Sequence, residues 1–211
     1  MTDFAELRAQ MVERQIAGRG IRDEAVLNAM RTVPREAFVA DTDRADAYGD
    51  HPLAIGFGQT ISQPYVVALM IAAAGIGPGD RVLEVGAGSG YAAAVISRVA
   101  REVIAIERIG ELAAAARERL ARLGYANVQI VEADGTLGWP AAAPYDAILA
   151  AASGRRVPQP LIDQLVPGGR LVMPVGGQLW TQSLVRLTRQ ASGDIQRENL
   201  AAVRFVPLIG S

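Results

Sequence analysis

The sequence predicts an α/β fold in which an open, doubly wound, mostly parallel sheet follows an N-terminal helical segment. Three observations support this. From Arg81 onward short apolar strands alternate with helical stretches, a glycine-rich loop follows the first strand, and half of the 211 residues are hydrophobic. Alternating strands and helices favour a parallel sheet with helices on both faces. We expect one domain, with residues 1–79 as the helical segment and loop and 80–211 as the α/β core.

The segment before the core is expected to be helical over its first fifty residues. Apolar residues such as Leu7, Met11 and Ile16 recur at helical spacing, and Val33-Pro34 ends a helix because the residue before proline avoids the helical region. Residues 48–59 contain Pro52, Gly56 and Gly58 and are predicted to form a loop. Ser62-Gln63-Pro64 is typical of a helix start, and that helix should reach about Ala74.

The core should contain five short strands and then two late ones. The late strands, Trp180–Arg189 and Ala201–Pro207, are expected to be antiparallel at one edge. A turn is predicted at Pro167-Gly168-Gly169. The remaining predicted elements are strands at 81–85, 102–107, 127–132, 145–150 and 170–175, and helices at 91–99, 111–123 and 158–165.

Composition excludes several kinds of protein. The chain has no cysteine, so disulfides, thiol nucleophiles and thiolate metal sites are ruled out, and with His51 alone no metal site is expected. The net charge of −1 gives no general attraction to nucleic acid. The N-terminus lacks the apolar stretch of a secretory signal, and the longest apolar run, 66–76, is too short to span a membrane, so we expect a cytoplasmic protein.

The glycine loop is the first candidate binding site. Gly86, Gly88, Ser89 and Gly90 lie between a strand and a helix, where backbone N–H groups can approach a ligand, although a plain tight turn would use the same residues. A dinucleotide fingerprint needs G-x-G-x-x-G, whose third glycine would fall at Tyr91, a side chain expected to crowd a pyrophosphate. Glu84, inside the preceding strand, suits a ligand with a cationic amino group.

Two further strand ends carry acidic residues. Glu107 lies 21 residues after Gly86, near the spacing of roughly 20 for an acid that accepts two ribose hydroxyls; alternatively it is a solvated charge paired with Arg108. Asp134-Gly135 could meet an adenine ring, or it could simply form a turn. A glycine loop, a glutamate and an Asp-Gly pair at successive strand ends are the pattern of class I S-adenosylmethionine methyltransferases.

The stretch Gly58-Gln-Thr-Ile-Ser-Gln-Pro64 needs a separate explanation. A hydroxyl at Ser62 would lie beside the positive end of a helix dipole, which favours a carboxylate ligand. The alternative is that Ser62 only caps its helix.

From end to end the chain resembles the protein-L-isoaspartate (D-aspartate) O-methyltransferase family of the bacterial type. The family-specific stretch is Gly58-Gln-Thr-Ile-Ser-Gln-Pro64. The other stretches that carry the resemblance are Met11-Val-Glu-Arg-Gln-Ile16, Val33-Pro-Arg-Glu-Ala-Phe38, Val82-Leu-Glu-Val-Gly-Ala-Gly-Ser-Gly-Tyr91, Gly138-Trp-Pro140, Tyr145-Asp-Ala-Ile148, Pro167-Gly-Gly-Arg-Leu-Val172 and Val203-Arg-Phe-Val-Pro-Leu208.

The resemblance implies S-adenosyl-L-methionine as methyl donor, S-adenosyl-L-homocysteine as product, and isoaspartyl and D-aspartyl residues of aged proteins as acceptors. It makes Ser62 the active-site serine. We further expect a monomer that binds neither nucleic acid nor membrane. The cofactor-binding residues expected are Thr60, Ile61, Glu84, Gly86, Gly88, Ser89, Gly90, Glu107, Arg108, Asp134 and Gly135.

The chain departs from the family after the fourth strand. It has Ala150-Ala-Ala-Ser153 where the family often has Val-Thr-Ala-Ala, and Arg155 and Arg156 follow where an acidic residue is common. Two rival functions remain: another small-molecule or RNA methyltransferase of the same class, and a protein that binds the cofactor without turnover.

Overall fold

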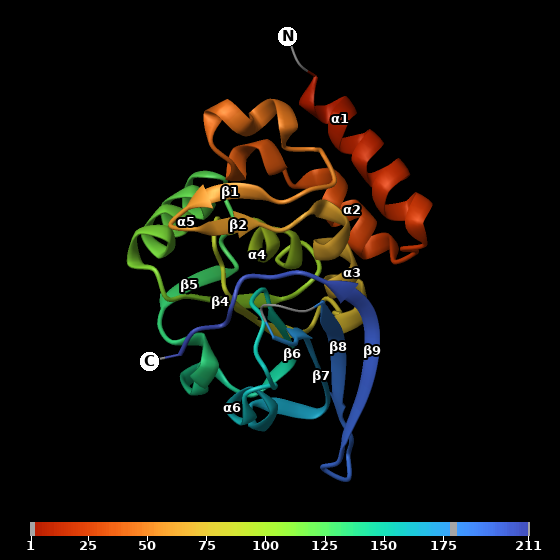
Figure 1. The fold of residues 1–211 in the computed structure, drawn as a ribbon, viewed down its shortest axis with the longest axis vertical. Helices are drawn as coiled ribbons and strands as arrows, with labels where there is room; N and C mark the ends of the chain where they lie inside the picture. Colours follow the sequence, from red (N-terminus) through yellow and green to blue (C-terminus); the bar gives the residue numbers. More distant parts are fainter. Residues whose placement is uncertain (1–2, 178–180, 211) are drawn as a thin grey trace.

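The fold is described by a computed structural model, which covers residues 3–177 and 181–210 (Figure 1). Its centre is a seven-stranded sheet in the order β5-β4-β3-β6-β7-β8-β9. The first five of these strands are parallel, and β8 and β9 continue the sheet antiparallel. The predicted doubly wound, mostly parallel sheet is therefore confirmed. The strands are β3 (Arg81–Val85), β4 (Glu102–Glu107), β5 (Val128–Glu132), β6 (Tyr145–Ala150), β7 (Leu165–Val175), β8 (Gln182–Arg189) and β9 (Ile195–Val203).

The strand order reverses between β3 and β6, at the middle of the sheet. The chain moves from β3 to β4 and β5 on one side, then returns to β6 and β7 on the other. In open α/β sheets, ligands bind in the crevice at the carboxyl ends of the strands where the order reverses. The glycine loop leaves β3 at this crevice, and the backbone N–H groups of Gly86 and Ala87 both donate to the Ile106 carbonyl of β4.

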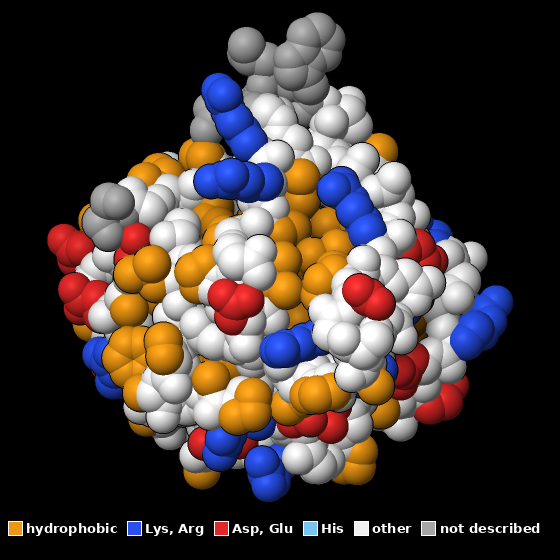
Figure 2. Space-filling view, turned by 90° about the horizontal axis from the view of Figure 1, so that it is seen from below, with side chains coloured by type: hydrophobic (Ala, Val, Ile, Leu, Met, Phe, Trp, Pro, Cys, Tyr) orange, Lys and Arg blue, Asp and Glu red, His pale blue; other side chains and the backbone are white. Residues whose placement is uncertain are grey.

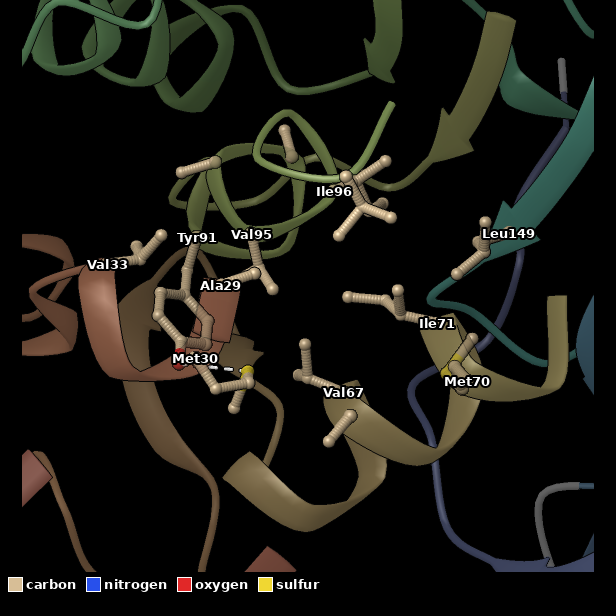
Figure 3. Packing of buried hydrophobic residues seen from close by; sticks show 14 of the residues in the cluster. Ala29, Met30, Val33, Val67, Met70, Ile71, Tyr91, Val95, Ile96 and Leu149 are labelled. Atoms are coloured by element: carbon tan, nitrogen blue, oxygen red, sulfur yellow. Dashed lines mark hydrogen bonds between the residues drawn. The ribbon is translucent and has the colours of Figure 1, made fainter. Parts of the chain in front are cut away.

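Two hydrophobic clusters, one on each face, hold the layers together. The first joins α3 (Pro64–Ala74), α4 (Tyr91–Ile96) and α5 (Gly110–Arg122) to the sheet and to the N-terminal helices. In Figure 3, labelled side chains from α2, α3, α4 and β6 point toward one another within this cluster. The second cluster packs α6 (Gln159–Asp163) and η6 (Pro140–Ala142) on the opposite face.

The N-terminal segment is helical, as predicted. Asp3 and Asp23 cap α1 and α2 by accepting backbone N–H bonds, and α2 ends at Thr32 with Val33 as its C-cap, where Val33-Pro34 predicted a helix end. Arg35, which follows α2, is fully buried, and its Nε donates to the Ala47 carbonyl at 2.7 Å. This hydrogen bond links the two short helical turns that follow α2. The elements are α1 (Phe4–Gln10), the π-helical η1 (Met11–Ile16), η2 (Ala17–Arg19), α2 (Glu24–Thr32), η3 (Arg35–Phe38) and η4 (Asp41–Asp46).

The loop predicted over residues 48–59 is wrong in its second half. It contains β1 (Leu53–Gly56), which pairs antiparallel with β2 (Gln59–Ile61) in a hairpin. The turn between them has positive φ at Gly56, Phe57 and Gly58. These turn residues suggested a loop, although they only reverse the direction of two short strands.

Other element boundaries also differ from the prediction. β9 begins at Ile195, and the predicted late strand at 201–207 covers only its end. The predicted turn at Pro167–Gly169 lies within β7, which bulges there: Tyr145 pairs with Leu165 but Ala147 pairs with Arg170. The helices α4 and α6 are shorter than expected. The strand predicted over Trp180–Arg189 is observed as β8, which begins at Gln182; Thr181 is not part of it, and Trp180 lies outside the described residues.

The segment after β9 returns across the carboxyl ends of the strands. Gln182, 1 % exposed, fixes it by donating to the Phe205 carbonyl at 3.1 Å and accepting from the Phe205 N–H at 2.7 Å. Ser153 then exchanges backbone hydrogen bonds with Val206 and Leu208, both at 2.8 Å. This segment forms a wall of the site described next. None of the described helices has the length and apolar character that a membrane crossing requires.

Candidate active site

An inner cavity lies between the sheet and helices α3 and α4, under the glycine loop. Its empty volume is ≈ 530 Å³, and it is mostly apolar. The hairpin residues Thr60, Ile61 and Ser62 close one side, and Gly86, Gly88 and Ser89 close another. Its remaining lining residues are Val67, Met70, Ile71, Glu84, Ala87, Tyr91, Ala92, Ile96, Leu149 and Ala151.

Glu84 brings an unpaired carboxylate into this cavity. The side chain is 2 % exposed, and its Oε2 has no hydrogen-bond partner among the described residues. Burial, and secondarily the charge of Glu107, raise the pKa of Glu84 well above its ordinary value. A buried carboxylate without a partner is costly, and a cationic group in the cavity would offset that cost. The predicted place of Glu84 beside a cationic amino group therefore fits the geometry.

A rim cavity of ≈ 660 Å³ lies next to the inner one, over the ends of β3 and β4. Glu107 lines it and is 6 % exposed. Its Oε2 accepts from the Gly88 N–H at 2.9 Å, and its Oε1 accepts from the Ile109 N–H at 3.0 Å. The expected alternative, in which Glu107 pairs with Arg108, is wrong, because the carboxylate is buried and bound to backbone. Each oxygen keeps a lone pair for a hydroxyl donor.

Close packing explains why the rim cavity is framed by glycine. A Cβ on Gly135 would lie 2.5 Å from Val85 Cγ1, and a Cβ on Gly88, whose φ is +54°, would lie 3.0 Å from Ile55 Cδ1. Gly135 and Arg108 line the cavity. The neighbouring Asp134 accepts from Thr136 N–H at 2.8 Å and Thr136 Oγ1 at 2.7 Å, so the turn chemistry that was its alternative reading is present.

An open groove of ≈ 1940 Å³ lies on the other side of the hairpin. Ser62 and Gln63 line it with the start of α3, and residues 201–206, at the end of β9 and just after it, form a wall. Ser62 is half-buried and lines both this groove and the inner cavity. The second reading of Ser62, as a helix cap, is wrong: Gln63 is the N-cap of α3, and no side chain of these two residues caps it.

Three spaces thus meet at two residues. Thr60 and Ala151 line the inner cavity, the rim cavity and the open groove alike. The structure brings all but two of the predicted site residues to these spaces. Gly90 instead is the N-cap of α4, and Asp134 forms the turn beside Gly135.

Several lining residues escaped prediction. Ala151 and the segment 206–209 carry no chemical signal in the sequence, because their place depends on how β6 ends and how the chain returns after β9. The expectation that the Tyr91 side chain would crowd a pyrophosphate is wrong. The centroid of its ring lies 5.6 Å from that of Phe38, and its hydroxyl donates to Met30 Sδ. The ring points into the core, so glycine spacing, and not crowding by Tyr91, disfavours a dinucleotide.

The fold and site define a class of protein. The strand order, the glycine loop, a buried acid at the end of β4 and an unpaired carboxylate in the inner cavity are those of class I S-adenosylmethionine-dependent methyltransferases. Within that class, the chain belongs to the protein-L-isoaspartate(D-aspartate) O-methyltransferase (PCMT) family, whose family model matches residues 6–211.

Individual relatives agree with this membership. The chain is 58 % identical over 204 residues to protein-L-isoaspartate O-methyltransferase 2 of Pelobacter propionicus, covering 97 % of this chain and 91 % of that protein. It is 59 % identical to protein-L-isoaspartate O-methyltransferase 1 of Rhodopseudomonas palustris, covering 99 % and 85 %. A Plasmodium falciparum structure assigned to the same activity, in complex with S-adenosyl-L-homocysteine, aligns with a TM-score of 0.80 at 28 % identity, covering 96 % and 98 %.

Proposed function

We propose that this chain transfers a methyl group from S-adenosylmethionine to the free carboxylate of isoaspartyl residues in damaged proteins and peptides. Its family is that of protein-L-isoaspartate(D-aspartate) O-methyltransferases. The observation that carries the proposal is the position of Ser62, which lines both the inner cavity and the open groove. A donor in the first and a peptide in the second would meet at this residue.

The residues present fit the donor. Glu84 would hold its amino group, and Glu107 would accept the ribose hydroxyls with the two oxygens already oriented by Gly88 and Ile109. Gly135 would allow the adenine ring to approach the backbone. The apolar residues that make up most of the inner cavity's lining suit the carbon chain between the amino group and the sulfonium. When bound, the donor would supply a methyl group carried on a sulfonium. The electron pair of the broken S–C bond stays on the sulfur, so the leaving group is a neutral thioether.

The protein's part in the reaction is alignment and exclusion of water. An acceptor carboxylate is already ionised at neutral pH, since such groups titrate near roughly 4, and no general base is required. The Ser62 hydroxyl would donate to one carboxylate oxygen and leave the other directed at the methyl group. Thr60 and Ala151, at the junction of the three spaces, would keep water from the reacting atoms. The nitrogen of the adjoining backbone amide then attacks the ester carbonyl and displaces methanol, which closes a succinimide whose hydrolysis restores some normal aspartate.

We further propose that the chain acts as a single methyltransferase domain, as a monomer in the cytoplasm, and without nucleic acid. One hydrophobic cluster includes residues from both 1–79 and 80–211, which supports a single domain. The face drawn in Figure 2 has basic and acidic side chains interspersed with apolar ones. Together with a net charge of −1, this disfavours binding to a polyanion. Light scattering would test the monomer.

The function is tested with a pair of peptides that differ only in an isoaspartyl or a normal aspartyl linkage, together with labelled donor. Methyl incorporation into the isoaspartyl peptide alone is expected. Equal labelling of both peptides would contradict the proposed specificity, and labelling of neither would contradict catalysis and favour a protein that only binds the cofactor.

A further inference from the structure

The helix that follows Ser62 begins without a local cap. Pro64 is the first residue of α3 and has no N–H, and neither Ser62 nor Gln63 accepts a bond from the next amides through its side chain. The Ser62 hydroxyl has no hydrogen-bond partner among the described residues. The first free amide of a helix normally takes a side-chain acceptor from the residue just before the helix. Here that acceptor comes from a distant part of the chain.

Asp50 supplies it. Its Oδ1 accepts from the Tyr65 N–H at 3.2 Å, fifteen residues along the chain. Its Oδ2 lies 2.5 Å from Arg19 Nη1, and the Arg19 guanidinium carbon lies 3.4 Å from the centroid of the Tyr65 ring. We call these three residues the clasp. The clasp joins η2, the segment before β1 and the first turn of α3.

The clasp is built on the acceptor side of the hairpin. Arg19 and Tyr65 line the open groove beside Ser62, and neither lines the inner or the rim cavity. The ion pair is partly exposed, with Arg19 at 46 % and Asp50 at 24 %, so its charge contributes modestly and the geometry of the bond to Tyr65 matters more. Its loss should therefore affect the acceptor and leave the donor site intact.

We propose that Asp50 is a positioning residue for methyl transfer: it caps α3 in place of Ser62, so that the Ser62 hydroxyl stays available to the acceptor carboxylate. Without Asp50, the Tyr65 N–H lies exposed at a positive helix end, and the nearest hydroxyl along the chain that could accept it is that of Ser62. Ser62 would then turn to the helix and away from the groove. This inference rests on the proposed function and deepens it.

Four variants separate capping from charge and from general stability. Asp50→Ala removes the cap and the ion pair, whereas Asp50→Asn keeps an oxygen that can accept from Tyr65 and loses only the charge. Asp50→Ala/Gln63→Ser restores a local cap, since serine at the N-cap accepts from this amide. Asp23→Ala is the matched control, because Asp23 caps α2 by the same chemistry, with bonds of 3.0 and 3.2 Å, and lines none of the three spaces.

For each variant we would measure kcat/KM for an isoaspartyl peptide, the affinity for S-adenosylhomocysteine, the melting temperature and hydrogen exchange of the Tyr65 amide. Asp50→Ala is expected to lower kcat/KM roughly tenfold, the equivalent of one lost cap, with donor affinity unchanged and faster exchange at Tyr65. Asp50→Asn should keep most of the activity, and the double variant Asp50→Ala/Gln63→Ser should be more active than Asp50→Ala. Asp23→Ala should melt earlier at full kcat/KM.

The inference is overturned if Asp50→Ala retains wild-type kcat/KM, or if Asp23→Ala loses as much activity as it does. An unchanged exchange rate at Tyr65 in Asp50→Ala would also overturn it, and that measurement needs no turnover. If the wild-type protein fails to methylate the peptide at all, the proposed function fails, a result distinct from active enzyme that is indifferent to Asp50.

Discussion

Glu84 on β3 and Glu107 at the end of β4 are both buried, yet their carboxylates are treated differently. Both oxygens of Glu107 accept backbone N–H groups, whereas Oε2 of Glu84 has no partner among the described residues. Burial raises the pKa of Glu84 and the charge of Glu107 raises it further. The backbone therefore holds the Glu107 carboxylate in a fixed orientation, whereas the Glu84 carboxylate could still be neutralised by a cationic group.

This difference predicts proton release on donor binding. In the empty protein Glu84 holds a proton at pH values below its raised pKa, and a cationic amino group favours the ionised form. Affinity for S-adenosylhomocysteine should therefore strengthen as pH rises between about 5 and 7, where the ligand's own amino group stays protonated. Calorimetry in two buffers of different ionisation enthalpy measures the released proton. Glu84→Gln should bind more weakly, with no release and no pH dependence; release that persists in Glu84→Gln would assign the proton elsewhere.

The same group predicts a pH-dependent stability. Because the pKa of Glu84 is raised in the folded protein, its contribution to the free energy of unfolding is fully present below the ordinary pKa of 4.5. That contribution is lost as the pH rises toward the pKa in the folded protein. Glu84→Gln removes that loss. Its melting temperature should match the wild type at acid pH and exceed it at neutral pH, by roughly 2–4 °C for each kcal/mol recovered. A difference that is constant with pH would contradict this.

Glu107→Ala should weaken donor binding by roughly 1.5–3 kcal/mol, the range for losing a charged hydrogen-bond partner. The acceptor should be little affected, because Glu107 lines the rim cavity and not the open groove. Titration with S-adenosylhomocysteine measures the loss. Glu132→Gln is the control: Glu132 pairs in register with Glu107 at the end of β5 but is exposed. Equal effects of both variants would remove Glu107 from the site.

Ser62→Ala should slow methyl transfer at unchanged melting temperature and unchanged donor affinity. The Ser62 side chain caps nothing, so the roughly 0.5–2 kcal/mol that a cap contributes should not be lost. Loss of one hydrogen bond to the charged acceptor corresponds to about 1.5–3 kcal/mol, or about a tenfold to hundredfold loss of rate. Single-turnover kinetics at saturating donor give the rate. Full activity with an earlier melting point would return Ser62 to a purely structural role.

At saturating donor, methyl transfer should be independent of pH between about 6 and 8, because the acceptor carboxylate is ionised throughout. His51 is exposed, its Nδ1 lies 3.3 Å from the Pro52 carbonyl, and it lines none of the three spaces. His51→Gln should therefore leave the profile unchanged. Methyl incorporation must be followed directly, since succinimide hydrolysis depends on base. A pH-dependent limb in this range that vanishes in His51→Gln would show that a base participates.

The sequence predicts the central parallel strands β3, β4 and β6 well because each is a short, mostly apolar run that is buried on both faces. It fails where a strand is exposed or interrupted by glycine. Residues 195–199 of β9 are exposed at the sheet edge and so lack an apolar pattern, and the hairpin around Gly56 and Gly58 has the composition of a loop.

Within the site, the sequence indicates groups that carry chemistry on their own, such as Glu84 and Glu107. Roles that depend on distant contacts are not visible in it. The cap of α3 illustrates this, since a serine just before a helix is the usual choice, whereas the cap comes from Asp50. The wall at Val206 is similar, because Gln182 fixes its neighbour Phe205 through a hydrogen-bond pair between residues 23 apart.

Thr60 and Ala151 line all three spaces, and this shared wall has a thermodynamic consequence. A ligand that shifts either residue on one side changes the surface offered to the ligand on the other. The two affinities are then linked, and linkage is reciprocal: whatever factor the nucleoside product adds to peptide binding, the peptide must add to nucleoside binding. A thermodynamic cycle of four titrations would close on a single coupling free energy.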